Sequence, residues 1–226
     1  IMKPASFDYH SPATVEEAVM LLNANGPDAR LLAGGQSLIP MMNFRLAAPA
    51  VIVDLNRIPD LAYIKVEGDA VCIGAMTRQR SIEFSALVAE KLPLLHQAIR
   101  LVGHLPTRTR GTIGGSIANA DPSAEIPMVL QALDGEAVVR GPNGLRTIAA
   151  SELFRDAMTT SLAPGEILIE VRLPAMAPGT GCAVEEFARR LGDFAIAKQH
   201  INSSAQLIEI LAIECHAYAN RQPLPQ

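Results

Sequence analysis

The chain has no tryptophan, only three cysteines and no long apolar run. Cys72, Cys182 and Cys215 lie far apart and form no Cys-x-x-Cys pair, so this chain carries no sequence signature of an iron–sulfur cluster or a zinc site. Scattered thiols in odd number are typical of a reducing compartment, and we expect a cytoplasmic protein. No segment has the pattern of a membrane span or a signal peptide, so neither is expected.

Basic charge is also scarce. The chain has 19 Lys and Arg against 23 Asp and Glu, a net charge of −4 and a pI near 5.7. Nucleic acid is therefore an unfavoured partner, because it requires a basic stripe. A phosphate ligand would have to be held by backbone amides and a few local arginines. The 226 residues, 49% of them hydrophobic, suffice for one large domain or two to three small lobes.

Two segments each combine an apolar approach, a Gly-Gly pair and a hydroxyl residue. They are Leu31-Leu32-Ala33-Gly34-Gly35-Gln36-Ser37 and Gly111-Thr112-Ile113-Gly114-Gly115-Ser116. Glycine permits close backbone approach and positive φ, and successive N–H groups in such a bend form an anion-binding nest. One such segment alone is more often a ligand-free turn. Two of them, brought together, would suit both phosphates of a dinucleotide.

The first segment is expected at the end of a strand. A capping box at Thr14 and Glu17 predicts a helix that ends at Asn25-Gly26-Pro27. A buried strand over 29–33 then leads into the first glycine segment, followed by helical character over 38–46 and a strand over 51–55. Ligands in open α/β sheets bind at the carboxyl ends of strands, which is where this segment is predicted.

The rest of the chain predicts a mixture of hairpins and helices. Hairpins are expected at 64–67 with 71–73 and at 137–140 with 145–148, a helix over 94–102, a strand over 167–173 and helical character around 205–217. Pro- and Gly-rich residues 174–181 are typical of a boundary.

No familiar nucleotide fingerprint is present, neither G-x-G-x-x-G nor a P-loop. Downstream of the second segment, Asp121 and Ser123 are equally well explained as loop residues that cap a helix or as a carboxylate facing a ribose. Arg108 and Arg110 are as readily solvated charges as phosphate ligands. The five histidines lack metal-ligand spacing, and no nucleophile or acid–base pair stands out. If the protein is an enzyme, a bound cofactor supplies the chemistry.

The two glycine segments resemble the flavin-binding medium subunit of the molybdenum-containing hydroxylases, a family that includes carbon monoxide dehydrogenase and relatives of xanthine dehydrogenase. The matching strings are residues 33–42 and 110–127, supported by 7–9, 165–168 and 187–193. The resemblance runs in order from about Lys3 to Ala197.

The resemblance implies an α+β fold of the PCMH/VAO FAD-binding type. Two α/β lobes, residues 1–56 and 57–174, would hold FAD, and residues 175–226 would form a C-terminal lobe of antiparallel sheet and helices. The chain departs from the family after Ala197, where similar proteins continue with a longer C-terminal lobe than residues 198–226 can supply. We therefore expect this lobe to be short, truncated or divergent, with too little sequence for its sheet.

The resemblance also implies noncovalent FAD, with its pyrophosphate at the two glycine segments and Ile167 or Leu168 near a ring. No catalytic or metal-binding residue is expected in this chain. The implied cofactor-binding residues are Leu31, Leu32, Ala33, Gly34, Gly35, Gln36, Ser37, Leu38, Gly111, Thr112, Gly114, Gly115, Ser116, Asn119, Asp121, Glu125, Ile167 and Leu168.

In such complexes a large subunit carries molybdopterin, a small subunit carries [2Fe-2S] clusters, and the FAD subunit passes electrons to an external acceptor. The resemblance thus implies an oxidoreductase subunit within a heterotrimer, assembled as a dimer of heterotrimers. Two alternatives stay open from the residues alone. One is a stand-alone flavin oxidoreductase of the same fold, and the other is a non-enzymatic module that binds a different phosphate ligand.

Overall fold

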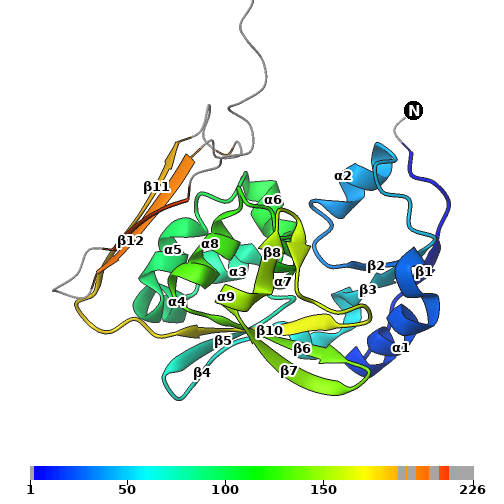
Figure 1. The fold of residues 1–226 in the computed structure, drawn as a ribbon, viewed down its shortest axis with the longest axis horizontal. Helices are drawn as coiled ribbons and strands as arrows, with labels where there is room; N and C mark the ends of the chain where they lie inside the picture. Colours follow the sequence, from blue (N-terminus) through cyan, green and yellow to red (C-terminus); the bar gives the residue numbers. More distant parts are fainter. Residues whose placement is uncertain (1–2, 188–191, 193–196, 204–208, 214–226) are drawn as a thin grey trace, which may run out of the picture.

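The computed structural model describes residues 3–187, 192, 197–203 and 209–213, and its elements form three sheets and a small β-ribbon (Figure 1). The first sheet is parallel, with strand order β1-β3-β2 and β3 in the middle. Its unit contains β1 (Asp8–His10), α1 (Val15–Asn25), η1 (Gly26–Asp28), β2 (Ala29–Leu32), α2 (Leu38–Asn43), β3 (Val51–Asp54), η2 (Leu55–Arg57) and η3 (Pro59–Leu61).

Helix α1 begins where the capping box predicted. Thr14 is extended, with φ −131° and ψ 158°, and its side chain accepts the Glu17 N–H at 3.2 Å. The Glu17 carboxylate accepts the Ala13 N–H at 3.0 Å, which secures the helix entry. Apolar residues of α1 then pack on the parallel sheet, and Ala18 and Val19 are buried against strand residues such as Val51. This packing fixes β2, and therefore the first glycine segment that follows it.

The second sheet has five strands in the order β4-β5-β10-β6-β7, all antiparallel to their neighbours. Its strands are β4 (Ile64–Glu67), β5 (Ala70–Gly74), β6 (Glu136–Gly141), β7 (Gly144–Ala149) and β10 (Ile167–Pro174). Short helices cover one face of this sheet (Figure 1). They are α3 (Gln79–Glu83), α4 (Ala86–Lys91), α5 (Pro93–Ala98), α6 (Leu105–Arg110), α7 (Ile113–Asn119), α8 (Glu125–Ala132) and α9 (Ala150–Leu153), with the β-ribbon of β8 (Phe154–Asp156) and β9 (Thr159–Thr160) beside them.

Strand β10 connects two hydrophobic cores. Its register shifts at a bulge between Leu168 and Glu170. Ile167 belongs to the core beneath the parallel sheet, whereas Leu168 belongs to the core between the five-stranded sheet and its helices. Because successive side chains of a strand point to opposite faces, these adjacent residues lie in two different cores.

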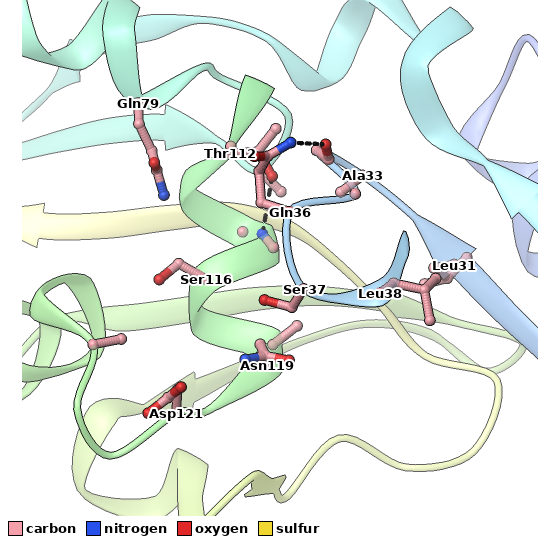
Figure 2. Close-up of a pocket in the computed structure, with 18 of the residues that line it drawn as sticks. Leu31, Ala33, Gln36, Ser37, Leu38, Gln79, Thr112, Ser116, Asn119 and Asp121 are labelled. Atoms are coloured by element: carbon pink, nitrogen blue, oxygen red, sulfur yellow. Dashed lines mark hydrogen bonds between the residues drawn. The ribbon is translucent and has the colours of Figure 1, made fainter. Parts of the chain in front are cut away.

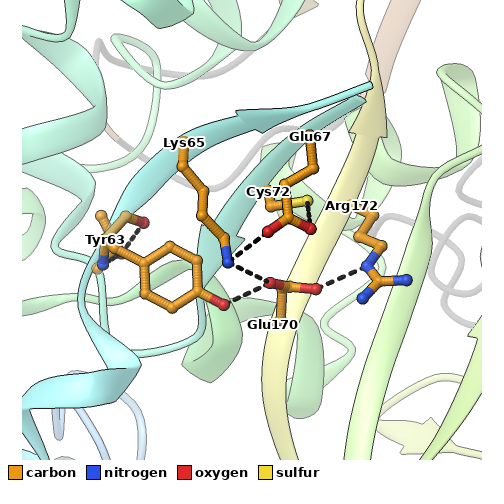
Figure 3. Close-up of polar contacts among 7 residues, drawn as sticks. Tyr63, Lys65, Glu67, Cys72, Glu170 and Arg172 are labelled. Atoms are coloured by element: carbon orange, nitrogen blue, oxygen red, sulfur yellow. Dashed lines mark hydrogen bonds and ion pairs between the residues drawn. The ribbon is translucent and has the colours of Figure 1, made fainter. Parts of the chain in front are cut away.

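The other face of the five-stranded sheet carries a polar cluster around Glu170, whose side chain is 7% exposed (Figure 3). Its carboxylate accepts hydrogen bonds from the Tyr63 hydroxyl and, at 2.6 Å, from Arg172 Nε, and Lys65 Nζ lies 3.9 Å away. Burial and the Glu170 hydrogen bond raise the pKa of Tyr63, and the same carboxylate raises the pKa of Arg172. The buried carboxylate is therefore balanced within the chain, and no ligand is needed to explain it.

The C-terminal region corrects two expectations. A three-stranded antiparallel sheet is present after all, in the order β11 (Gly181–Phe187), β12 (Ala197–Ser203) and β13 (Glu209–Ile213). The helix expected around 205–217 is wrong over Glu209–Ile213, which forms a strand because β12 offers it a full pairing edge. The rest of that expected helix, at 205–208 and 214–217, lies outside the described residues, as does most of 187–193.

Candidate functional site

The two glycine segments, far apart in the sequence, lie against each other. A Cβ added to Gly34 would collide with the Arg110 carbonyl oxygen and come within 2.8 Å of the Gly111 Cα. A Cβ on Gly115 would lie 3.5 Å from the Ala33 Cβ. The expectation that the fold brings these segments together is therefore confirmed, and the absence of a side chain at Gly34 is what permits the approach.

The first segment is a loop with open amides. Gly35 has φ +73°, a conformation that disfavours any residue with a Cβ. Within the described residues, the N–H groups of Gly35, Gln36 and Ser37 donate to no acceptor, and the Ser37 hydroxyl makes no hydrogen bond. Successive free N–H groups around a left-handed glycine are the elements of an anion-binding nest.

The second segment is not a loop, and here the sequence interpretation was wrong. Gly114, Gly115 and Ser116 form the first turn of α7, and the Thr112 hydroxyl caps that helix by accepting the Gly115 N–H at 3.1 Å. The Gly114 N–H donates to the Ala75 carbonyl at 2.9 Å. These amides already have partners, so the segment offers no free nest.

Close packing explains the glycines of this second segment instead. A Cβ on Gly114 would lie 2.5 Å from the Ala75 Cβ and 2.8 Å from its carbonyl oxygen. Gly114 therefore lets α7 pack directly on the end of β5. The helix is held against the five-stranded sheet, and its N-terminal turn faces the first segment.

A cavity of about 820 Å³ opens where the two segments meet (Figure 2). Small-molecule and cofactor pockets typically measure about 300–1,000 Å³, so this one is at the large end of the range. All the residues predicted from the sequence line it except Leu32. Leu32 follows Leu31 on β2, and successive side chains of a strand point to opposite faces, so only Leu31 faces the cavity.

The cavity has apolar and polar walls. The apolar wall includes Leu38 and Met41 of α2 together with residues that belong to or pack against the two cores: Leu22, Leu31, Leu55, Val102, Ile167 and Leu168. The polar wall carries side chains from α3, from α6, from α7 with its N-cap residue, from the loop after α7 and from the start of α8: Gln79, Thr107, Thr112, Ser116, Asn119, Asp121 and Glu125. An elongated ligand with a ring and a polar linker matches such a lining.

Asp121 serves the local loop as well as the cavity wall. Its Oδ1 accepts the Ser123 N–H at 2.8 Å and the Ser123 hydroxyl at 2.6 Å, which orders the loop. It does not cap α8 as the structural interpretation expected, because the N-cap of that helix is Ala124, which has no side-chain cap. Glu125 begins α8, is 7% exposed and also lines the cavity. Two acidic residues thus line the cavity.

Two side chains, Asn56 and Arg78, connect the two glycine segments by hydrogen bonds to backbone carbonyls. Asn56 donates to the Ala33 carbonyl at 3.0 Å, and Arg78 donates to the Arg110 carbonyl. Arg78 also donates to the Asn56 side-chain oxygen at 2.5 Å. Burial and nearby Arg110 lower the pKa of the Arg78 guanidinium. This clasp, Asn56 with Arg78, ties each glycine segment to the other through side chains.

The flanking arginines do not face the cavity. Arg108 bonds Glu83 at 3.0 Å and the carbonyls of Val102 and Gly103, so it holds α6 in place. Arg110 is exposed and does not line the cavity.

Several lining residues escaped the sequence reasoning, including Gln79, His104, Thr107 and Met158. They lie outside both glycine segments, and single polar residues without a motif give no signal in the sequence. Only the tertiary packing of α3, α6 and the β-ribbon brings them to the cavity.

Within the part of the chain that the structure describes, no three histidine, cysteine or acidic side chains gather as a metal site would require. In the same part, every helix is too short or too polar to cross a lipid bilayer.

Comparison with known proteins agrees with this geometry. The model of the family described as "FAD binding domain in molybdopterin dehydrogenase" matches residues 5–176. The chain is 46% identical to the carbon monoxide dehydrogenase medium chain of Hydrogenophaga pseudoflava, covering 87% of this chain and 68% of that one. It is 45% identical to the 6-hydroxypseudooxynicotine dehydrogenase complex subunit alpha of Paenarthrobacter nicotinovorans, covering 86% and 66%. The chain thus matches about two thirds of the length of these relatives.

Solved structures give the same result and confirm the expected α+β fold. Carbon monoxide dehydrogenase from Hydrogenophaga pseudoflava superposes with a TM-score of 0.89 at 44% identity, over 92% of this chain and 74% of that one. Quinoline 2-oxidoreductase from Pseudomonas putida 86 superposes with a TM-score of 0.87 at 35% identity, over 91% and 71%.

Proposed function

The chain belongs to the family of FAD-binding domains in molybdopterin dehydrogenases, and on that premise we propose that it carries the FAD of a molybdenum-containing hydroxylase or dehydrogenase. One observation carries the proposal: two glycine segments meet at the wall of a cavity that is large enough for a dinucleotide and lined on one side by apolar residues. Bound FAD would supply electron transfer, accepting electrons from one partner and passing them to another.

The residues of this chain would bind and orient the cofactor. The open amides of Gly35, Gln36 and Ser37, with the Ser37 hydroxyl, suit one phosphate of the pyrophosphate. The polar wall, with Ser116, Asn119 and the Glu125 carboxylate, suits the sugar hydroxyls beside it. The apolar wall suits a ring and excludes water from it. The predicted site residues other than Leu32 are proposed as this cofactor site.

We assign the second glycine segment a different part in the same site. Its amides are occupied, so it would position the ligand through the Ser116 side chain and through close packing, without a nest of its own. No residue is assigned an acid–base role, because electron transfer through a bound cofactor does not require one.

The proposal extends to partners. Similar chains are named as a medium chain of carbon monoxide dehydrogenase and as a subunit of a dehydrogenase complex. We therefore propose a large molybdopterin subunit and a small [2Fe-2S] subunit, in a dimer of heterotrimers that resides in the cytoplasm. We also propose that residues 1–56 and 57–174 act as the two lobes around FAD, with residues 175–226 beyond them.

Isolation of the full-length protein from its native source tests the proposal. The expected result is a yellow complex that releases one FAD per copy of this chain on denaturation and contains molybdenum and iron. A colourless protein that takes up no added FAD would contradict it. A flavoprotein that copurifies with neither metal would favour the stand-alone oxidoreductase, and a bound nucleotide without flavin would favour the binding module.

A further inference from the structure

Gln79 is a buried amide that the described chain leaves without a partner. It is the first residue of α3, it is 5% exposed, and it lines the cavity (Figure 2). Its side-chain oxygen is fully covered and accepts no hydrogen bond from any described residue. Buried polar groups are almost always hydrogen-bonded, so an exception beside a ligand cavity calls for an explanation.

The backbone fixes Gln79 beside the second glycine segment. The Gln79 N–H donates to the Gly111 carbonyl at 2.9 Å. A Cβ on Gly111 would lie 2.6 Å from the Gln79 side-chain oxygen, so Gly111 leaves the space that this amide occupies. The position of the side chain is therefore set by a main-chain bond and a missing Cβ.

The neighbouring polar groups are already engaged. The Gly111 N–H donates to the Thr107 carbonyl at 2.7 Å, and the Thr112 hydroxyl accepts the Gly115 N–H. The Arg110 carbonyl accepts from Arg78. Among the described residues, these groups thus offer Gln79 no partner. Its oxygen is covered by the chain itself, so a ligand in the cavity can reach only its NH₂ group, for which no described residue acts as acceptor (Figure 2).

We propose that Gln79 binds the cofactor directly, with its NH₂ group donating to a hydrogen-bond acceptor of the cofactor. This inference rests on the proposed function, because it takes FAD as the occupant. Both halves of FAD carry acceptors, namely ring carbonyl oxygens on the flavin half, ring nitrogens and sugar oxygens on the adenosine half, and phosphate oxygens between them. Gln79 thus adds one donor to the polar wall of the cavity.

Gln79→Met tests the inference, because methionine keeps the length of the side chain and removes the amide. Gln131→Met is the matched control, since Gln131 is exposed on α8 and does not line the cavity. In the full-length protein, FAD affinity is measured by titration of the apo form, and apo stability by its thermal midpoint. We expect Gln79→Met to weaken FAD binding about tenfold, the change expected for one lost hydrogen bond of about 1.4 kcal/mol. Its apo midpoint should stay level or rise, because an unpaired buried amide has been removed.

The two readouts separate a ligand contact from a structural role. Unchanged FAD affinity in Gln79→Met overturns the inference, and so does a lower apo midpoint with a proportional loss of affinity. A wild-type protein that binds no FAD refutes the proposed function itself, which is a distinguishable failure. Repeating the titration with ADP and with FMN shows which half of the cofactor pairs with Gln79.

Discussion

The two glycine segments have similar sequences and different physical roles. The first is a loop in which Gly35 adopts positive φ and the following amides stay open. The second is a helix start in which the Gly114, Gly115 and Ser116 amides have partners and Gly114 permits contact with Ala75. A Gly-Gly pair followed by a hydroxyl therefore marks either an anion-binding bend or a tight packing contact, and only the backbone conformation separates the two.

Substitution at the contact between the two segments should cause the largest loss of stability and of FAD affinity. Gly34→Ala places a Cβ against the Arg110 carbonyl, where the backbone on both sides must move. We expect about 3 kcal/mol less free energy of unfolding and FAD binding weakened by a factor on the order of 100, measured by urea denaturation and FAD titration. Gly68→Ala is the control for a glycine substitution without a collision, because a Cβ there meets no atom within 4 Å; its φ of +59° should cost only about 1 kcal/mol of backbone strain and leave FAD affinity unchanged. Equal behaviour of the two variants would contradict a role for close approach.

The second largest effect is expected at the clasp, the pair of Asn56 and Arg78 that connects the glycine segments. Arg78→Met removes the donors to the Arg110 carbonyl and to Asn56, and a lost hydrogen bond to a charged group costs about 1.5–3 kcal/mol. Because each partner needs the other, Asn56→Ala combined with Arg78→Met should cost less than the sum of the single changes. A double-mutant cycle in urea measures this coupling. Strict additivity would show that the two side chains act independently.

Removing one hydroxyl from each segment tests their different roles, because one hydroxyl caps a helix and the other is open to the cavity. Thr112→Ala removes a helix cap and should lower the free energy of unfolding by about 1 kcal/mol, with a smaller effect on FAD affinity. Ser37→Ala removes a hydroxyl that caps nothing and should leave apo stability nearly unchanged while it weakens FAD binding. If Ser37→Ala lowered stability and Thr112→Ala mainly lowered FAD affinity, the assigned roles of the two segments would be wrong.

The smallest expected effect depends on pH and lies at the start of β10. The Arg146 hydrogen bonds hold the pKa of Glu166 below its usual range. This stabilisation is complete above the unfolded pKa of about 4.3 and is lost as the pH falls through the lower folded value. Arg146 is 44% exposed, so we expect only about 0.5–1 kcal/mol. Glu166→Gln should remove this part of the acid destabilisation, and urea midpoints between neutral and acidic pH measure it. The glycine segments are joined by backbone contacts and by Asn56 and Arg78, neither of which changes its charge between neutral and acidic pH, so these contacts should show no such dependence.

Much of this fold was predictable because local signals agreed with tertiary packing. The Thr14 cap and the hairpin pairs carry their structure in neighbouring residues, and each appears where expected. The helix predicted around 205–217 failed over Glu209–Ile213, because pairing with β12 outweighed local helical character. The cavity residues in the glycine segments were predictable from a repeated motif. Gln79 and the clasp were not, because they become neighbours of the segments only through the packing of separate elements.

The placement of adjacent β10 residues in two different cores affects how the molecule unfolds. Ile167 and Leu168 seal different cores from consecutive positions, so neither core can loosen without pulling on the other. We expect a single cooperative melting transition for the two cores, with no stage at which one survives alone. A ligand held between them would then raise one shared midpoint, and thermal shift would report cofactor binding for the whole assembly.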